Sequence, residues 1–200
     1  MNLSVRRRET PATALILLSG AAAVVGVLLL FGLRLNFVFD LARLQFLFKV
    51  AYATALACAV IWLALRSGRP GVTLKPALAL LAAVLAVGVM VSVGDLATMA
   101  KNDRVTALFG ETWRVCARNI ATLAIFPAPI LVYTLRRMAP TDLRVTGAAV
   151  GASAGAVAAS AYGLLFCPEL SPAFVVTWYT LGVVVAAAIG AASAGRMLSW

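Results

Sequence analysis

Hydrophobic and polar positions form long alternating blocks along this chain, rather than the short periodic pattern of a soluble helix or strand. Apolar stretches are separated by short segments that hold the charged residues together with glycine and proline. A helix that crosses a bilayer needs about 20 apolar residues, and each block is long enough. The pattern predicts six spanning helices, at residues 12–33, 46–65, 74–93, 117–136, 145–166 and 173–194.

Composition supports this pattern. Hydrophobic residues make up 63% of the 200 positions and charged residues 12%, and the mean hydropathy is +1.00. Such a chain is too apolar for an ordinary water-soluble core. We expect an all-α integral membrane protein, a bundle of six transmembrane helices that forms one membrane domain over residues 1–200. A cleavable signal peptide is the alternative at the N-terminus, but the first apolar run exceeds the 7–15 residues of a signal core.

The net charge of +10 indicates how the chain is oriented in the membrane rather than that it binds nucleic acid. The reason is that the 17 basic residues sit at the ends of the predicted spans. Ten lie on the N-terminal side: Arg6, Arg7, Arg8, Arg66, Arg69, Lys75, Arg136, Arg137, Arg144 and Arg196. Seven lie on the opposite side: Arg34, Arg43, Lys49, Lys101, Arg104, Arg114 and Arg118. The bias places both termini and the short segment 1–11 in the cytoplasm, with the chain in a bacterial inner membrane and no direct contact with nucleic acid.

Small residues at steps of four mark a packing stripe on the last two predicted spans. The glycines in this stripe are Gly147, Gly151, Gly155 and Gly163 in the fifth span, and Gly182 and Gly190 in the sixth. Such stripes allow close helix contact in lipid, so we expect these two helices to pack tightly against each other. A homodimer formed through the same stripe is the alternative. Pro127 and Pro129 predict a kink in the fourth span.

Three cysteines carry the candidate chemistry. Cys58 lies in the middle of the second span, where we expect inert packing. Cys116 begins the fourth span and Cys167 follows the fifth, and antiparallel neighbours would bring both thiols to the same outer surface. A structural disulfide, two unrelated buried thiols, and a redox sensor or transient heavy-metal site all remain open there. Asp95, Asp103, Glu111 and Arg118 are predicted near this surface, either as solvated charges at span ends or as groups that tune the thiols.

Ordinary catalytic patterns are absent from the sequence. The chain has no histidine, no glycine-rich phosphate loop after a strand, and no pair of carboxylates inside a span. We therefore expect neither an enzyme nor a resident cofactor. A transporter would be expected to carry charges near the bilayer centre, and none falls there in the predicted spans.

Several motifs resemble the NrsF family of membrane anti-sigma factors. They are Trp113-Arg114-Val115-Cys116, Phe126-Pro127, Leu135-Arg136-Arg137-Met138-Ala139-Pro140-Thr141, Ala161-Tyr162, Cys167-Pro168-Glu169, Trp178-Tyr179 and Gly195-Arg196-Met197-Leu198-Ser199-Trp200. The resemblance covers the membrane part of the chain, with its specific motifs concentrated between residues 113 and 200.

The resemblance implies regulation. Proteins of this family hold an extracytoplasmic-function sigma factor at the inner face of the membrane and release it when heavy metal or oxidant acts on two outward-facing cysteines. By position these are Cys116 and Cys167. Family members carry a longer segment before the first span, so either the true start lies upstream of this sequence or the connectors at 66–75 and 136–144 supply more of the sigma-binding surface. A membrane thiol–disulfide oxidoreductase and a small metal exporter are the alternatives.

Overall fold

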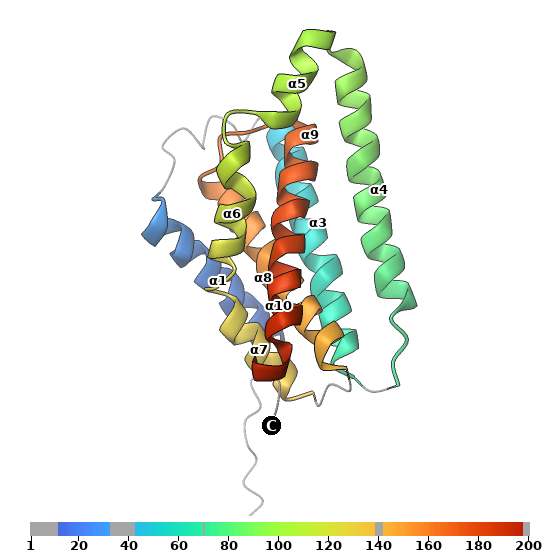
Figure 1. Cartoon of the computed structure of the whole chain (residues 1–200), viewed down its shortest axis with the longest axis vertical. Helices are drawn as coiled ribbons and strands as arrows, with labels where there is room; N and C mark the ends of the chain where they lie inside the picture. Colours follow the sequence, from blue (N-terminus) through green and yellow to red (C-terminus); the bar gives the residue numbers. More distant parts are fainter. Residues whose placement is uncertain (1–11, 33–42, 70, 139–141, 198–200) are drawn as a thin grey trace, which may run out of the picture.

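The computed structural model describes residues 12–32, 43–69, 71–138 and 142–197, and all regular structure within them is helical. The prediction of an all-α fold is confirmed for this part of the chain. The elements are α1 (Ala12–Leu30), α3 (Leu44–Ser67), α4 (Lys75–Thr98), α5 (Lys101–Phe109), α6 (Trp113–Leu123), α7 (Ala128–Arg136), α8 (Leu143–Leu165), α9 (Pro172–Phe174), the π-helical turn η1 (Val175–Tyr179) and α10 (Thr180–Met197) (Figure 1). The segment 1–11 with Arg6, Arg7 and Arg8, and also Arg34, lie outside the described residues.

Helices suited to cross a membrane account for most of the described chain. Five are long and apolar enough: α1, α3, α4, α8 and the continuous stretch Pro172–Met197. A sixth results if α5 and α6 are counted with α7 as one bent span. The six predicted spans therefore correspond to helices of the structure, while insertion in the bilayer and the side of each terminus stay predictions.

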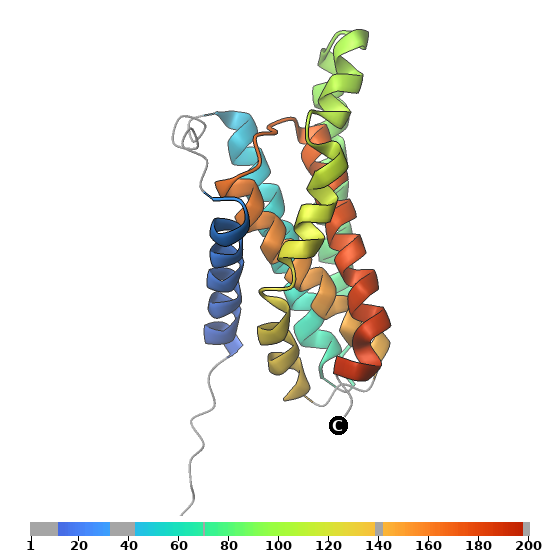
Figure 2. The same cartoon turned by 60° about the vertical axis from the view of Figure 1, so that its left-hand side comes forward.

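The fourth predicted span is broken at its prolines. Helix α6 ends at Leu123, a turn covers residues 124–127, and α7 begins at Ala128, with a bend of 44° between the helical segments (Figure 2). Pro127 has no N–H for a helical bond, and the carbonyl of Leu123 accepts instead from the Phe126 N–H at 3.1 Å. The predicted kink is confirmed, and the structure extends this helical segment upstream of the predicted residue 117.

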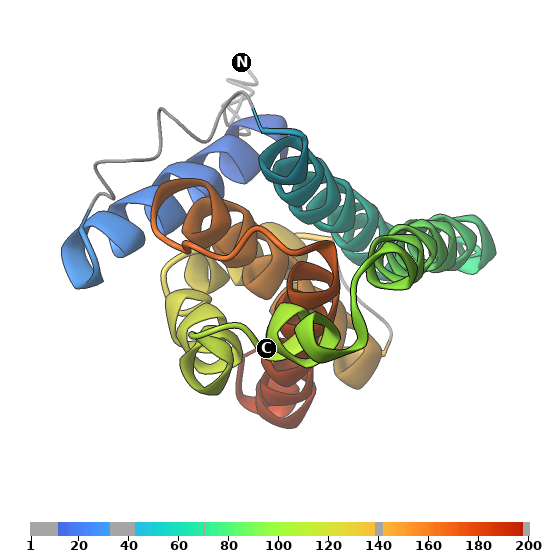
Figure 3. The same ribbon diagram turned by 90° about the horizontal axis from the view of Figure 1, so that it is seen from above.

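Helix α8 is the centre of the bundle. Most of its residues are buried, and it packs against α1, α3, α6, α7 and α10. Helix α4 stands outside this group, where it contacts α3, α9 and η1 and buries only Ala77, Gly88 and Ser92 (Figure 3). A structural change transmitted from one side of the bundle to the other therefore involves the contacts of α8.

The closest helix contact joins α8 to α10 through small residues. A Cβ atom added to Gly147 would lie 2.5 Å from the Gly190 carbonyl oxygen, and one on Gly155 would lie 2.8 Å from the Ala186 Cβ. Gly151 and Gly190 also lie at this contact, against backbone atoms of the opposite helix. These glycines let the two backbones approach more closely than any side chain would allow.

The predicted stripe does not hold over its whole length. Gly163 faces the ring of Tyr179 in η1, and Gly182 faces Ile120 of α6 rather than α8. Steps of four in a helix of 3.6 residues per turn rotate by about 40° each, so positions two steps apart already point in different directions. The stripe therefore serves three contacts inside the chain.

Candidate functional site

Two of the three cysteines meet at one end of the bundle. We call this the cysteine end; it contains the start of α3, the end of α4, α5 and the loop 166–171 (upper end in Figure 1). Cys116 in α6 is 0% exposed and Cys167, two residues after α8, is 2% exposed, and the two thiols are near enough to interact electrostatically. Both are free thiols. Cys58 is exposed on the surface of α3 and takes no part in this site.

Lys49 holds the backbone beside Cys167. Its side chain is 1% exposed, and Nζ donates to the carbonyl oxygens of Cys167 at 2.8 Å and Glu169 at 3.0 Å. The ammonium also lies over the ring of Phe46, 5.4 Å from the centroid. We counted Lys49 among the basic residues of the outer side, and the structure places it near the start of α3 at the cysteine end, with its charge on buried carbonyls. A lysine within an apolar block was the available sequence signal, since a cation there is costly without partners.

Glu169 ties the same loop to the start of α6. Its Oε1 accepts from the N–H groups of Glu111 at 2.8 Å and Thr112 at 3.1 Å, and from the Thr112 hydroxyl at 3.2 Å. Thr112 is the N-cap of α6, so the carboxylate sits where the helix presents unpaired N–H groups and positive partial charge. Gly110 has φ +55°, and a Cβ there would lie 2.6 Å from the Glu169 carboxyl carbon. The loop is therefore held by α3 from one side and by α6 from the other.

These contacts make the two thiols unequal. Cys167 lies outside the spanning helices, where the hydrogen bond from Cys116 lowers the pKa of its thiol, and the charge of Lys49 lowers it further against the opposing effect of burial. The thiolate is the nucleophile and the metal ligand among the forms of cysteine. A lowered pKa therefore favours reaction at Cys167.

Aromatic side chains lie at this end of the bundle. Trp113 of α6 and Trp178 of η1 lie 5.4 Å apart between ring centroids, and the Trp178 indole N–H donates to the Leu108 carbonyl at 2.9 Å. Tyr179, fully buried in the π-helical turn, lies next to Cys167. Sequence reasoning missed this turn, and the local sequence gives no sign of it. π-Helical turns inside helices are frequent at functional sites, and here the turn places Trp178 and Tyr179 on two sides of the site.

An acidic cavity of about 510 Å³ opens beside the loop. Its lining includes Asp103 of α5, Glu111 and Glu169. Asp95 and Arg118, also predicted near the thiols, are not part of this lining. Carboxylates around an opening raise the local concentration of cations, and this opening is lined by Pro168 and Glu169, which follow Cys167 in the loop. Within the described residues, no group of three or more histidine, cysteine or acidic side chains is arranged to hold a metal ion.

Comparison with known proteins agrees with the motifs. The family model NrsF, described as negative regulator of sigma F, matches residues 3–200. A protein of Azospira oryzae named "Probable anti-sigma-F factor NrsF" is 33% identical over 180 residues, which cover 90% of this chain and 84% of that protein. The "Anti-sigma-F factor NrsF" of Caulobacter vibrioides is 38% identical over 93 residues, 46% of this chain and 43% of that protein. No solved structure matches the chain.

Proposed function

Because the chain belongs to the NrsF family of negative regulators of sigma F, whose members regulate rather than catalyse, we propose that it is a membrane anti-sigma factor with a thiol switch. It holds an extracytoplasmic-function sigma factor at the cytoplasmic face of the inner membrane. Oxidation or heavy-metal binding at Cys116 and Cys167 releases that factor. The observation that carries the switch is that the two thiols interact while both are buried, one in α6 and the other in the loop that follows α8.

The chemistry of the pair suits two kinds of signal. In oxidation, the thiolate of Cys167 attacks a peroxide, and the Cys116 sulfur then closes the disulfide, so that two electrons and two protons convert the peroxide to two waters. In metal binding, a soft divalent cation replaces the two thiol protons and bridges both sulfurs. The acidic cavity lined by Pro168 and Glu169, the residues after Cys167, would concentrate such cations. Either event changes the distance between α6 and the end of α8.

Coupling to the other side of the membrane follows from the connectivity. Helix α6 continues through the proline break into α7, which ends at Arg136, and α8 begins at Leu143. The connector between α7 and α8 is thus attached at both ends to helices that carry or adjoin a cysteine. Such coupling requires two discrete packings of these helices, of which the reduced contact is one.

The partner surface lies at the opposite end, which we call the arginine end. Its basic residues among those described are Arg66, Arg69, Lys75, Arg136, Arg137, Arg144 and Arg196, and Asp142 is the acidic residue there. The excess of arginine favours the cytoplasmic side, and it suits an acidic surface on the sigma factor.

Retention of a sigma factor on membranes tests the proposal. The tagged full-length chain is expressed with an extracytoplasmic-function sigma factor of the same genome, and the membrane-bound fraction of that factor is measured before and after hydrogen peroxide or Cd²⁺. We expect retention when reduced and a loss of at least about fivefold on treatment, the lower end of typical coupling between sites. Cys116→Ser and Cys167→Ser should retain the factor throughout, and Cys58→Ser should respond like the unaltered chain.

The outcomes separate the parts of the proposal. Release from both serine variants would overturn thiol sensing alone. A sigma factor that never associates with the membranes would overturn the anti-sigma role of this pair. Quinone reduction by the purified chain, or metal flux into vesicles that contain it, would favour the oxidoreductase or the exporter instead.

A further inference from the structure

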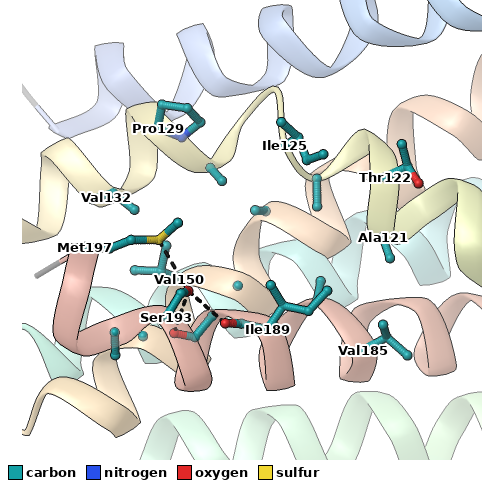
Figure 4. Close-up of a pocket in the computed structure, with 18 of the residues that line it drawn as sticks. Ala121, Thr122, Ile125, Pro129, Val132, Val150, Val185, Ile189, Ser193 and Met197 are labelled. Atoms are coloured by element: carbon teal, nitrogen blue, oxygen red, sulfur yellow. Dashed lines mark hydrogen bonds between the residues drawn. The ribbon is translucent and has the colours of Figure 1, made fainter.

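An apolar groove of about 1000 Å³ runs along the bundle on the side away from α3 and α4. One wall is formed by α6, the turn with Ile125, and α7 with Val132, and the other by α10, with Val185 and Ile189 (Figure 4). Val150 and Gly151 of α8 form its floor. The groove exists because the proline break draws the α6–α7 wall aside while the floor carries small side chains that do not fill the space.

The walls offer almost no polar group in the apolar stretch. The hydroxyl of Ser193 donates to the Ile189 carbonyl at 2.7 Å, so its hydrogen is used within α10. Ile125 is 66% exposed and Ile189 is 55% exposed. These apolar surfaces favour a hydrocarbon occupant.

Charge appears only where the groove ends. Arg118 lines it toward the cysteine end, and Arg136 and Arg196 both line it at the arginine end. The Arg136 Nε donates to the carbonyl of Met197, which fixes this guanidinium at the mouth of the groove. Two arginines at one mouth give it a positive charge, which favours an anion there.

We propose that the groove binds an anionic phospholipid, with its acyl chains along the walls and its phosphate at Arg136 and Arg196. The inference rests on the membrane placement in the proposed function and on nothing concerning the sigma factor or the cysteines. A guanidinium matches phosphate oxygens with paired N–H donors, and basic pockets between spanning helices on the cytoplasmic side bind anionic headgroups. A zwitterionic lipid adds a cation next to these arginines and binds less well.

A second copy of this chain fits the groove less well. In a two-fold dimer with its axis along the membrane normal, the same patch meets itself, so Arg136 and Arg196 of both copies would come together at one depth. Like charges at that distance oppose association, whereas an anionic headgroup neutralises them. The glycine contact that commonly drives helix dimers is already occupied by α10.

Native mass spectrometry of the purified full-length chain, released from bilayers of equal parts phosphatidylglycerol and phosphatidylcholine, tests this inference. We expect one retained phosphatidylglycerol with a preference of roughly tenfold or more, from the contribution of two arginines near the headgroup. The double variant Arg136→Gln/Arg196→Gln should lose the preference. The matched variant Arg69→Gln/Arg144→Gln removes two exposed arginines from the same end but outside the groove, and should keep it.

A second pair of variants tests the apolar part. Ile189→Trp fills the groove and should displace bound lipid of either headgroup, whereas Val184→Trp, on an exposed position of α10 outside the groove, should not. Equal binding of the two lipids, equal behaviour of the two arginine doubles, or dimers that exclude lipid would each overturn the inference. A chain that does not associate with lipid vesicles in flotation would overturn both the membrane placement and this inference. None of these measurements involves binding of a sigma factor.

Discussion

The ammonium group of Lys49 donates to the carbonyl oxygen of Cys167 at 2.8 Å, across 118 positions of sequence. The charge that perturbs the thiol therefore also fixes the backbone on which the thiol sits. A change at Cys167 that moves this backbone must break or stretch a hydrogen bond to a buried cation. Such bonds contribute about 1.5–3 kcal/mol, so the reduced arrangement is held firmly until the thiols react.

Alkylation of Cys167 should depend on pH in a defined direction. Since the fold lowers the pKa of this thiol, the thiolate is present at lower pH in the folded chain than in the unfolded one. The same shift makes the fold gain stability from this group as pH rises toward the unfolded value and lose it as pH falls through the folded one. Rates of iodoacetamide labelling, followed by mass spectrometry in a Cys58→Ser background, should reach half their plateau at lower pH before denaturation than after. If the pH midpoint of labelling is the same before and after denaturation, the lowered pKa of Cys167 is contradicted.

Replacing Lys49 should weaken both effects. Lys49→Met removes the positive charge, so the labelling midpoint of Cys167 should move to higher pH. It also leaves two buried carbonyls without this donor, which costs about 1–3 kcal/mol. Thermal unfolding in detergent measures that cost. Lys75→Met, on an exposed lysine at the arginine end, is the control and should alter neither quantity.

Glu169→Gln should destabilise the start of α6 without removing any apolar contact. The neutral amide still accepts a hydrogen bond but loses the charge that the helix N-terminus favours, a loss of about 0.3–1 kcal/mol. We expect a lower melting temperature and faster labelling of Cys116 as the turn at Thr112 opens. Glu111→Gln is matched, because only the backbone N–H of Glu111 takes part in the cap. Equal melting of the two variants would argue against the charged cap.

A large side chain at Gly151 should separate α8 from α10. A Cβ there already meets the Ala186 carbonyl oxygen, so Gly151→Leu forces the backbones apart, at a cost of about 1–3 kcal/mol or more. Gly94→Leu provides the comparison, because a Cβ at Gly94 meets nothing within 4 Å. Denaturation in detergent should show a clear loss for the first variant only. Similar stability of both would mean that the two helices are not held by this contact.

Some of this arrangement could be read from the sequence for physical reasons. Apolar length sets where a helix can cross lipid, and proline removes an N–H wherever it stands, so the spans and the break at Pro127 follow from local chemistry. The same counting of spans put Cys116 and Cys167 at one end. Their burial and contact needed the structure, because both depend on how α6 turns about its own axis.

Other features depend on contacts that no local pattern encodes. The role of Lys49 arises from carbonyls more than 100 positions away, and a rule that counts charges at span ends cannot distinguish a buried lysine from a solvated one. The cap that Glu169 places on Thr112 has the same cause. Gly182 contacts α6 instead of α8, because small residues at steps of four turn progressively around a helix. Sequence spacing alone does not show this rotation.

The break at residues 124–127 has a mechanical consequence. It divides the segment that carries Cys116 into α6 and a nine-residue helix, α7, joined by a turn rather than by a continuous ladder of hydrogen bonds. A small tilt of α6 at the cysteine end can therefore swing α7 as a short lever while α8 stays in place. Moving Arg136 then requires only that α7, about two turns of helix, changes its orientation. A full span does not have to move past the helices that pack against it.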